Sequence, residues 1–70
     1  MSKNNMCKLI GFWVRTMWDD VGARDGVVVE ADDDGKSGRV YFPFGDSTEL
    51  VRVSQVTAVG SRLLAVHTGL

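Results

Sequence analysis

The sequence of 70 residues contains one cysteine, one histidine and one proline. Cys7 alone cannot form an intramolecular disulfide, and Cys7 with His67 cannot complete the ligand set of a structural zinc ion. A chain of this length buries only about 60% of the surface that its unfolded form exposes. Neither a disulfide nor a zinc ion therefore stabilises this small core, so we expect self-association to bury additional surface. We also predict no metal and no cofactor.

The sequence also lacks a long hydrophobic run. The apolar stretch over residues 9–14 is interrupted by Gly11, whereas a membrane-spanning helix needs about 20 apolar residues. We therefore expect a soluble, cytoplasmic protein with no membrane partner. Residues 1–7 are expected to form a flexible N-terminal tail, and residues 8–70 a single domain.

No catalytic motif is recognisable. Cys7 and His67 lie near opposite ends of the chain, with no acid placed to orient a nucleophilic pair. The aspartate run at residues 32–34 lacks the alternating spacing and the distal glutamate of a calcium loop. We therefore predict no catalytic residue and no metal ligand, and the sequence alone does not say what the protein does.

The net charge of −1 hides an uneven distribution. Residues 19–34 hold seven acids against Arg24, a net charge of −6, so the rest of the chain is positive. Contact with nucleic acid would therefore use the later part of the chain. The alternative is that these aspartates only keep the loops solvated.

The dipeptide Asp34-Gly35, between runs of β-branched and aromatic residues, predicts a two-residue hairpin in which both turn residues take positive φ. This register sets Glu30 against Arg39 and Val29 against Val40. It predicts a core face and an outer face. The core face comprises Val27, Val29, Val40 and Phe42, and the outer face Val28, Glu30, Arg39 and Tyr41.

Further strands follow from alternation and turn residues. A first strand is predicted over residues 8–18, with Ile10, Phe12 and Val14 on one face, then a loop to residue 26. The predicted second and third strands cover residues 26–31 and 38–44. A turn at residues 45–48 would set Tyr41 beside Arg52. A single helical turn at residues 54–56 precedes a strand at 57–59, and residues 61–67 form a sixth strand or a closing helix.

These elements predict an all-β fold, a small SH3-like barrel of five or six antiparallel strands with a short 3-10 turn before the last barrel strand. Over about residues 10–59 the pattern resembles Src-homology-3-like, KOW, Tudor and type II dihydrofolate reductase domains. The resemblance is carried by the segments Val-Gly-Ala-Arg-Asp-Gly-Val-Val-Val-Glu-Ala from Val21, Gly-Arg-Val-Tyr-Phe-Pro from Gly38 and Leu-Val-Arg-Val-Ser-Gln-Val-Thr-Ala-Val from Leu50.

The resemblance implies three kinds of function. A KOW-like module would contact RNA through the loop at residues 19–26, which here is acidic. The glutamine and tyrosine of the reductase pore motif are not reproduced near residues 50–54. A Tudor-like cage for a methylated cation would draw on Trp13, Trp18, Tyr41 and Phe44, with Asp19 and Asp20. Core packing is the alternative for these aromatic residues.

We expect a non-enzymatic interaction module that binds a protein partner or a second copy of itself. Its candidate interface combines Trp18 at the loop entrance with an outer strip of mixed apolar and charged residues: Val28, Glu30, Arg39, Tyr41, Leu50 and Arg52. The same strip is also explained by cross-strand surface pairs. The alternatives are a nucleic-acid-binding module that uses Arg39, Arg52 and Arg62, and an enzyme whose composite site forms on oligomerisation.

Overall fold

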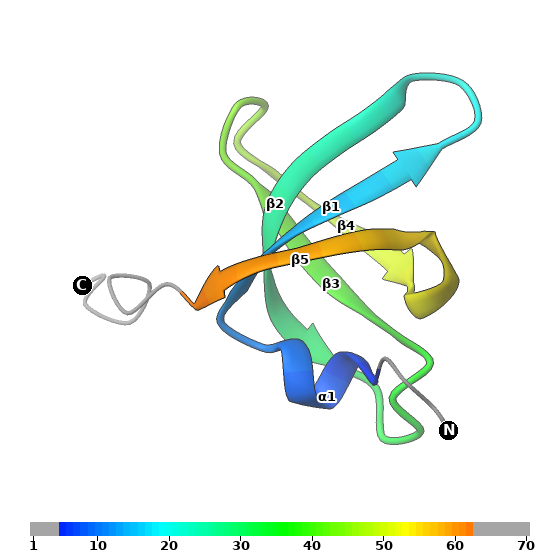
Figure 1. Ribbon diagram of the computed structural model, residues 1–70, viewed down its shortest axis with the longest axis vertical. Helices are drawn as coiled ribbons and strands as arrows, with labels where there is room; N and C mark the ends of the chain where they lie inside the picture. Colours follow the sequence, from blue (N-terminus) through cyan, green and yellow to red (C-terminus); the bar gives the residue numbers. More distant parts are fainter. Residues whose placement is uncertain (1–4, 63–70) are drawn as a thin grey trace.

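The computed structural model describes residues 5–62 and shows one five-stranded antiparallel sheet in the order β4-β3-β2-β1-β5 (Figure 1). The elements are α1 (Met6–Leu9), β1 (Phe12–Trp18), β2 (Gly22–Ala31), β3 (Ser37–Phe42), β4 (Ser47–Arg52), the 3-10 turn η1 (Val53–Gln55) and β5 (Val56–Arg62). The predicted all-β class and the short 3-10 turn before the last strand are confirmed. The predicted sixth strand or closing helix falls mainly outside the described residues, and Arg62 ends β5.

The sheet is strongly bent, and within residues 5–62 no ladder joins its edge strands β4 and β5. The β1–β2 hairpin and the β3–β4 turn reach toward one end of the molecule, whereas α1 and the β2–β3 turn lie at the other (Figure 1).

Neither helix of the described segment has the length and apolar character needed to cross a membrane.

The core joins valines of every strand to the short helix. Val14, Val28, Val40 and Val51 are fully buried, and Phe42 is 2% exposed. Two α1 residues complete the core cluster: Met6 and Leu9. The domain therefore includes Met6, which the sequence analysis placed in the tail.

The N-terminal segment differs from the predicted strand because it forms a helical turn. Asn5 caps α1, its side chain accepting a hydrogen bond of 2.8 Å from the Cys7 amide. Gly11, at φ +90°, separates α1 from β1. Leu9 is buried and Ile10 is 44% exposed, so Ile10 does not share the buried face of Val14 as the predicted strand would require.

The β2–β3 hairpin has the predicted register near its turn, where Glu30 lies opposite Arg39. Its turn differs: the Gly35 amide donates to the Asp32 carbonyl, and only Gly35, at φ +73°, adopts positive φ among the turn residues. The Asp34 carboxylate accepts a hydrogen bond of 2.9 Å from the Lys36 amide. The Asp34 side chain thus stabilises the turn, and Asp34 itself does not adopt the left-handed conformation.

A β-bulge shifts the rest of this hairpin by one residue. Val28, not Val29, lies opposite Val40, and the register changes between Val28 and Glu30. Val28 is fully buried and Val29 is 38% exposed. The predicted faces were therefore wrong for these two valines, and Val27, although buried, shares the face of Tyr41 and not that of Val40. The reason is that a bulge adds one unpaired residue to a strand.

The β3–β4 register also differs from the prediction. Tyr41 lies opposite Thr48, and Arg52 lies opposite Ser37. Pro43 follows the end of β3, as expected for a residue without an amide hydrogen. The turn comprises residues 43–46, where Asp46 takes φ +50°, so β4 begins earlier than predicted.

Candidate functional site

The two faces of the β1–β2 hairpin carry different chemistry. Thr16 lies opposite Arg24 in the ladder, and Arg15 lies opposite Asp25. Residues directly opposite one another share a face, and successive residues alternate between faces. Arg24 therefore shares the inner face with buried Thr16, whereas Arg15 and Asp25 lie on the outer face.

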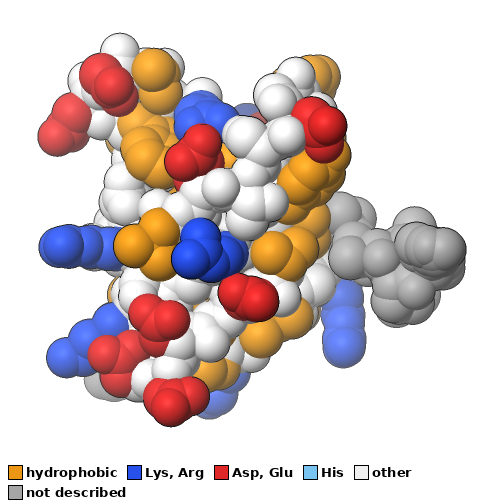
Figure 2. All heavy atoms as spheres, turned by 180° about the vertical axis from the view of Figure 1, so that it is seen from behind, with side chains coloured by type: hydrophobic (Ala, Val, Ile, Leu, Met, Phe, Trp, Pro, Cys, Tyr) orange, Lys and Arg blue, Asp and Glu red, His pale blue; other side chains and the backbone are white. Residues whose placement is uncertain are grey.

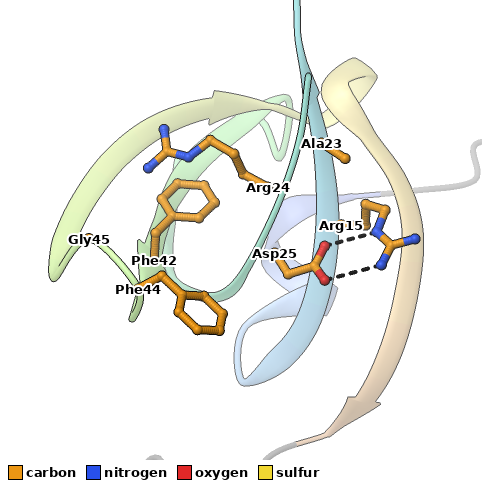
Figure 3. Close-up of a pocket in the computed structure, with 7 residues that line it drawn as sticks. All are labelled: Arg15, Ala23, Arg24, Asp25, Phe42, Phe44 and Gly45. Atoms are coloured by element: carbon orange, nitrogen blue, oxygen red, sulfur yellow. Dashed lines mark hydrogen bonds and ion pairs between the residues drawn. The ribbon is translucent and has the colours of Figure 1, made fainter. Parts of the chain in front are cut away.

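Arg24 packs on two aromatic rings. Its guanidinium carbon lies 4.1 Å from the centre of the Phe42 ring and 5.3 Å from the centre of the Trp18 ring. The two rings meet edge to face at 6.2 Å, with an interplanar angle of 70°. Cation–π attraction and the apolar stem hold the Arg24 side chain over Phe42 (Figure 3).

Thr16 links the backbone of Arg24 to Trp18. Its side chain is fully buried, and its hydroxyl donates a hydrogen bond of 2.9 Å to the Arg24 carbonyl. The same oxygen accepts a hydrogen bond of 2.8 Å from the Trp18 indole nitrogen. Both polar groups are thereby satisfied, and the orientation of the indole is set.

Arg15 and Asp25 form a two-pronged ion pair beside this cluster. Arg15 Nε and Nη2 lie 2.9 Å and 3.2 Å from the two Asp25 carboxylate oxygens (Figure 3). The hydrogen bond from Arg15 lowers the pKa of Asp25, and the bond to Asp25 raises the pKa of Arg15. Each charge of this pair is therefore matched by its neighbour.

A cavity lies between the β1–β2 hairpin and the β3–β4 turn, beside Arg24 and the Arg15–Asp25 ion pair. We call it the Arg24 pocket. Its volume is about 510 Å³, which is within the usual range for ligand pockets. Phe44 stands at its rim with 95% of its surface exposed (Figure 3). The pocket is lined by Arg15, Ala23, Arg24, Asp25, Phe42, Phe44 and Gly45.

The predicted interface residues fall on two different faces. Trp18 is half-buried and packs against Phe42 beside the Arg24 pocket. Arg39 lies between Glu30 on β2 and Leu50 on β4, which makes a row across the outer face. Viewed from behind, hydrophobic, basic and acidic side chains are interspersed (Figure 2).

Two further members of the predicted strip change place. Val28 is fully buried in the core, so it cannot contact a partner. Arg52 is exposed at the end of β4, away from Tyr41 in the ladder. Tyr41 is half-buried, and its hydroxyl donates a hydrogen bond of 2.7 Å to Asp46. Of the predicted strip, Glu30, Arg39, Tyr41 and Leu50 share the outer face, and Arg52 lies at its edge.

The aromatic residues considered for a methyl-cation cage do not gather. Trp13 and Tyr41 both lie opposite Val27 in the two ladders. Each of the three alternates with a fully buried valine of its strand, which places the two rings on the outer face. Trp18 lies on the inner face, where the cation against its ring is Arg24 of the chain itself. An internal arginine therefore takes the place that a methylated cation would occupy.

Arg24 was not predicted as a site residue because residues 18–26 were interpreted as a loop. In the structure β2 begins at Gly22, at φ +81°, after a tight turn. Glycine at a turn and the matching alternation around Thr16 and Arg24 are signals of a hairpin at this position. They would have placed Arg24 on the inner face.

Comparison with protein-family models, characterised proteins and solved structures finds no match to this chain. Function is therefore inferred from the geometry of the Arg24 pocket.

Proposed function

We propose that this protein is a non-enzymatic interaction module that binds a segment of a protein partner at the Arg24 pocket. The observation that carries the proposal is the position of Phe44, 95% exposed at the rim of a cavity. Burying a phenylalanine side chain contributes about 1.5–3 kcal/mol. Aromatic anchors of this kind often dominate the binding energy of an interface.

The β3–β4 turn supports the proposal because it holds Phe44 in a defined position. The Gly45 and Asp46 amides donate hydrogen bonds of 3.2 Å to the carbonyls of Phe42 and Pro43. Tyr41 ties down the Asp46 side chain. A turn that is already ordered loses little conformational entropy on binding.

The arrangement of the later arginines supports a protein partner over nucleic acid. Arg39 pairs with Glu30 at 3.5 Å, which reduces its attraction for phosphate. Arg52 ends β4 and Arg62 ends β5, so roughly 20 Å of strand separates them. The nucleic-acid-binding module and the composite-site enzyme stay predictions from the sequence.

Self-association through β5 is a second candidate, favoured by the character of this edge strand. Its residues 56–61 contain no charge and no proline, and all but Val56 are exposed. Among residues 5–62, β5 pairs only with β1. Edge strands that stay unpaired usually carry charges or proline.

We also propose that the module works in the cytoplasm, where free cysteines such as Cys7 are common.

Selection from a displayed library of random peptides tests binding at the Arg24 pocket. We expect selected peptides to bind the wild-type protein and to lose at least tenfold in affinity with Phe44→Ser. Leu50→Ser, which changes a 56% exposed residue on the other face, is the matched control and should bind normally. Peptides that bind Phe44→Ser as tightly as wild type would overturn the proposal.

Light scattering over a range of protein concentrations tests the β5 candidate. Val59→Lys should shift a dimer toward monomer, whereas Val29→Lys on β2, also a partly exposed valine, should not. A wild-type protein that is monomeric throughout rules out this candidate.

A further inference from the structure

We infer that the Arg24 pocket recognises a carboxylate that stands beside an aromatic or large apolar side chain in the bound segment. The inference rests on the proposed function and adds the chemistry of the partner. It follows from the unpaired state of Arg24, from the two aromatic rings that its guanidinium contacts, and from the apolar surface next to it.

Arg24 is the cation of the pocket that has no acidic partner within residues 5–62. The ion pairs of this part of the chain are Arg15 with Asp25 and Arg39 with Glu30. No buried side-chain nitrogen or oxygen among the described residues lacks a hydrogen-bond partner. Since the guanidinium of Arg24 has no hydrogen bond to the described part of the chain, its nitrogens reach solvent.

Aromatic contact prepares this guanidinium for an anion. Its central carbon lies over the Phe42 and Trp18 rings, and its N–H edge makes no hydrogen bond within residues 5–62. A carboxylate accepts two parallel hydrogen bonds from such an edge. Because the side chain is already ordered over Phe42, binding costs less rotamer entropy than it would for a free surface arginine.

The charge of the lining favours one carboxylate. The charges of Arg15 and Asp25 cancel, so Arg24 leaves the pocket with one net positive charge. Asp19 and Asp20 follow Trp18 in the turn of the same hairpin. They would repel a run of acids, which favours a single carboxylate in an otherwise neutral segment.

The surface beside Arg24 selects the neighbouring side chain. Phe44 is almost fully exposed, and Ala23 adds a small apolar contact in the lining. A partner side chain that packs against this surface would lose contact with water. Aromatic or large apolar residues gain most from such burial.

Four short peptides test the inference by nuclear magnetic resonance titration, with the Trp18 indole N–H and the Arg24 Nε–H as reporters. One pair is acetyl-Ala-Glu-Phe-Ala-amide and its Gln analogue. The other is acetyl-Ala-Phe with a free carboxylate and its amide, which separates a side-chain source from a chain end. We expect the charged member of at least one pair to bind at least tenfold more tightly.

Arg24→Gln should abolish the difference within that pair, and Arg24→Lys should keep only part of it. The ratio within one variant is insensitive to any loss of stability. Arg39→Gln, which removes an exposed arginine from the outer face, should leave the ratio unchanged. Equal binding within both pairs, a ratio that persists in Arg24→Gln, or no binding at millimolar peptide overturns the inference.

The two proposals can fail separately. If charged and neutral peptides bind equally, and Phe44→Ser abolishes both, the partner site stands and the carboxylate inference is wrong. If Phe44→Ser leaves all binding unchanged, the partner site at this pocket is wrong.

Discussion

The Arg24 guanidinium carbon, near the start of β2, lies 4.1 Å from the centre of the Phe42 ring at the end of β3. The contact closes the end of the core, where Phe42 is 2% exposed and Trp18 completes the cluster. It also turns a charged residue toward the one end of the molecule at which Phe44 is available to a partner. Stability and binding therefore share the Arg24 side chain.

Arg24→Ala should lower the free energy of unfolding by about 1–2 kcal/mol, because it removes both the cation–π contact and the stem that covers Phe42. Arg39→Ala, which changes an arginine whose side chain is 54% exposed, should lower it by less than about 0.5 kcal/mol. Urea unfolding followed by tryptophan fluorescence measures both. Equal losses would show that the aromatic contact adds nothing.

Tyr41 is the sole tyrosine of the chain, so its ionisation can be followed directly by ultraviolet absorbance. The hydrogen bond to Asp46 raises the pKa of Tyr41 above its ordinary value, with smaller contributions from burial and charge. Its stabilising effect is present below the unfolded pKa of about 10 and is lost as the pH rises through the folded pKa. Asp46→Asn should lower the pKa of Tyr41, and Asp20→Asn, in the other turn, should not.

Asp25 makes stability depend on acid pH. Its pKa is lowered chiefly by the hydrogen bond from Arg15. The contribution is therefore present above the unfolded pKa of about 3.9 and is lost as the pH falls through the lower, folded pKa. Urea midpoints measured from neutral to acid pH should fall less steeply for Asp25→Asn than for wild type. Identical profiles would mean that the ion pair does not form in solution.

Gly26 lies where two strands approach closely. A Cβ at this position would stand 2.4 Å from the Tyr41 carbonyl oxygen and 2.8 Å from side-chain atoms of Val40 and Phe42. Gly26→Ala should therefore cost about 2 kcal/mol or more in the free energy of unfolding. Gly45→Ala is the matched control, since its Cβ meets only the Ser47 hydroxyl at 3.7 Å. Tolerance of Gly26→Ala would contradict the β2–β3 packing.

Glu30 and Arg39 test the register of the central hairpin. They lie opposite one another, 3.5 Å apart, with side chains 70% and 54% exposed. Glu30→Arg should cost about 0.5 kcal/mol, because the pair is exposed and the new charges repel. Adding Arg39→Glu should restore much of that loss in a double-mutant cycle measured at low salt. No recovery would indicate a different register.

Features that depend on neighbours in the chain could be predicted from the sequence. The strand class, the reversal near Gly35 and the opposition of Glu30 and Arg39 all follow from local patterns, whereas β3 ends two residues earlier than predicted, before Pro43. The local signals are alternation, turn residues and the missing amide hydrogen of proline. The part of the candidate site that was predicted, Trp18, comes from such a signal at a strand end.

Choices between chemically equal residues could not be predicted. Val27, Val28 and Val29 are the same residue type, so no hydrophobic pattern says which of them the ladder omits. The bent sheet buries Val28 against Val40 and leaves Val29 in the bulge. The β3–β4 register likewise depends on a turn that begins at Pro43, since several residues of this segment are typical of turns.

Local patterns in the chain are enough to specify an antiparallel all-β domain with a central hairpin, because turn chemistry and alternation act between residues that are close along the chain. Only the tertiary structure decided that Arg24 meets Phe42 and Trp18, and that Phe44 stands exposed beside them. That meeting depends on how far the sheet bends and on where β2 begins. Both are set by packing across the core, which residue order alone does not specify.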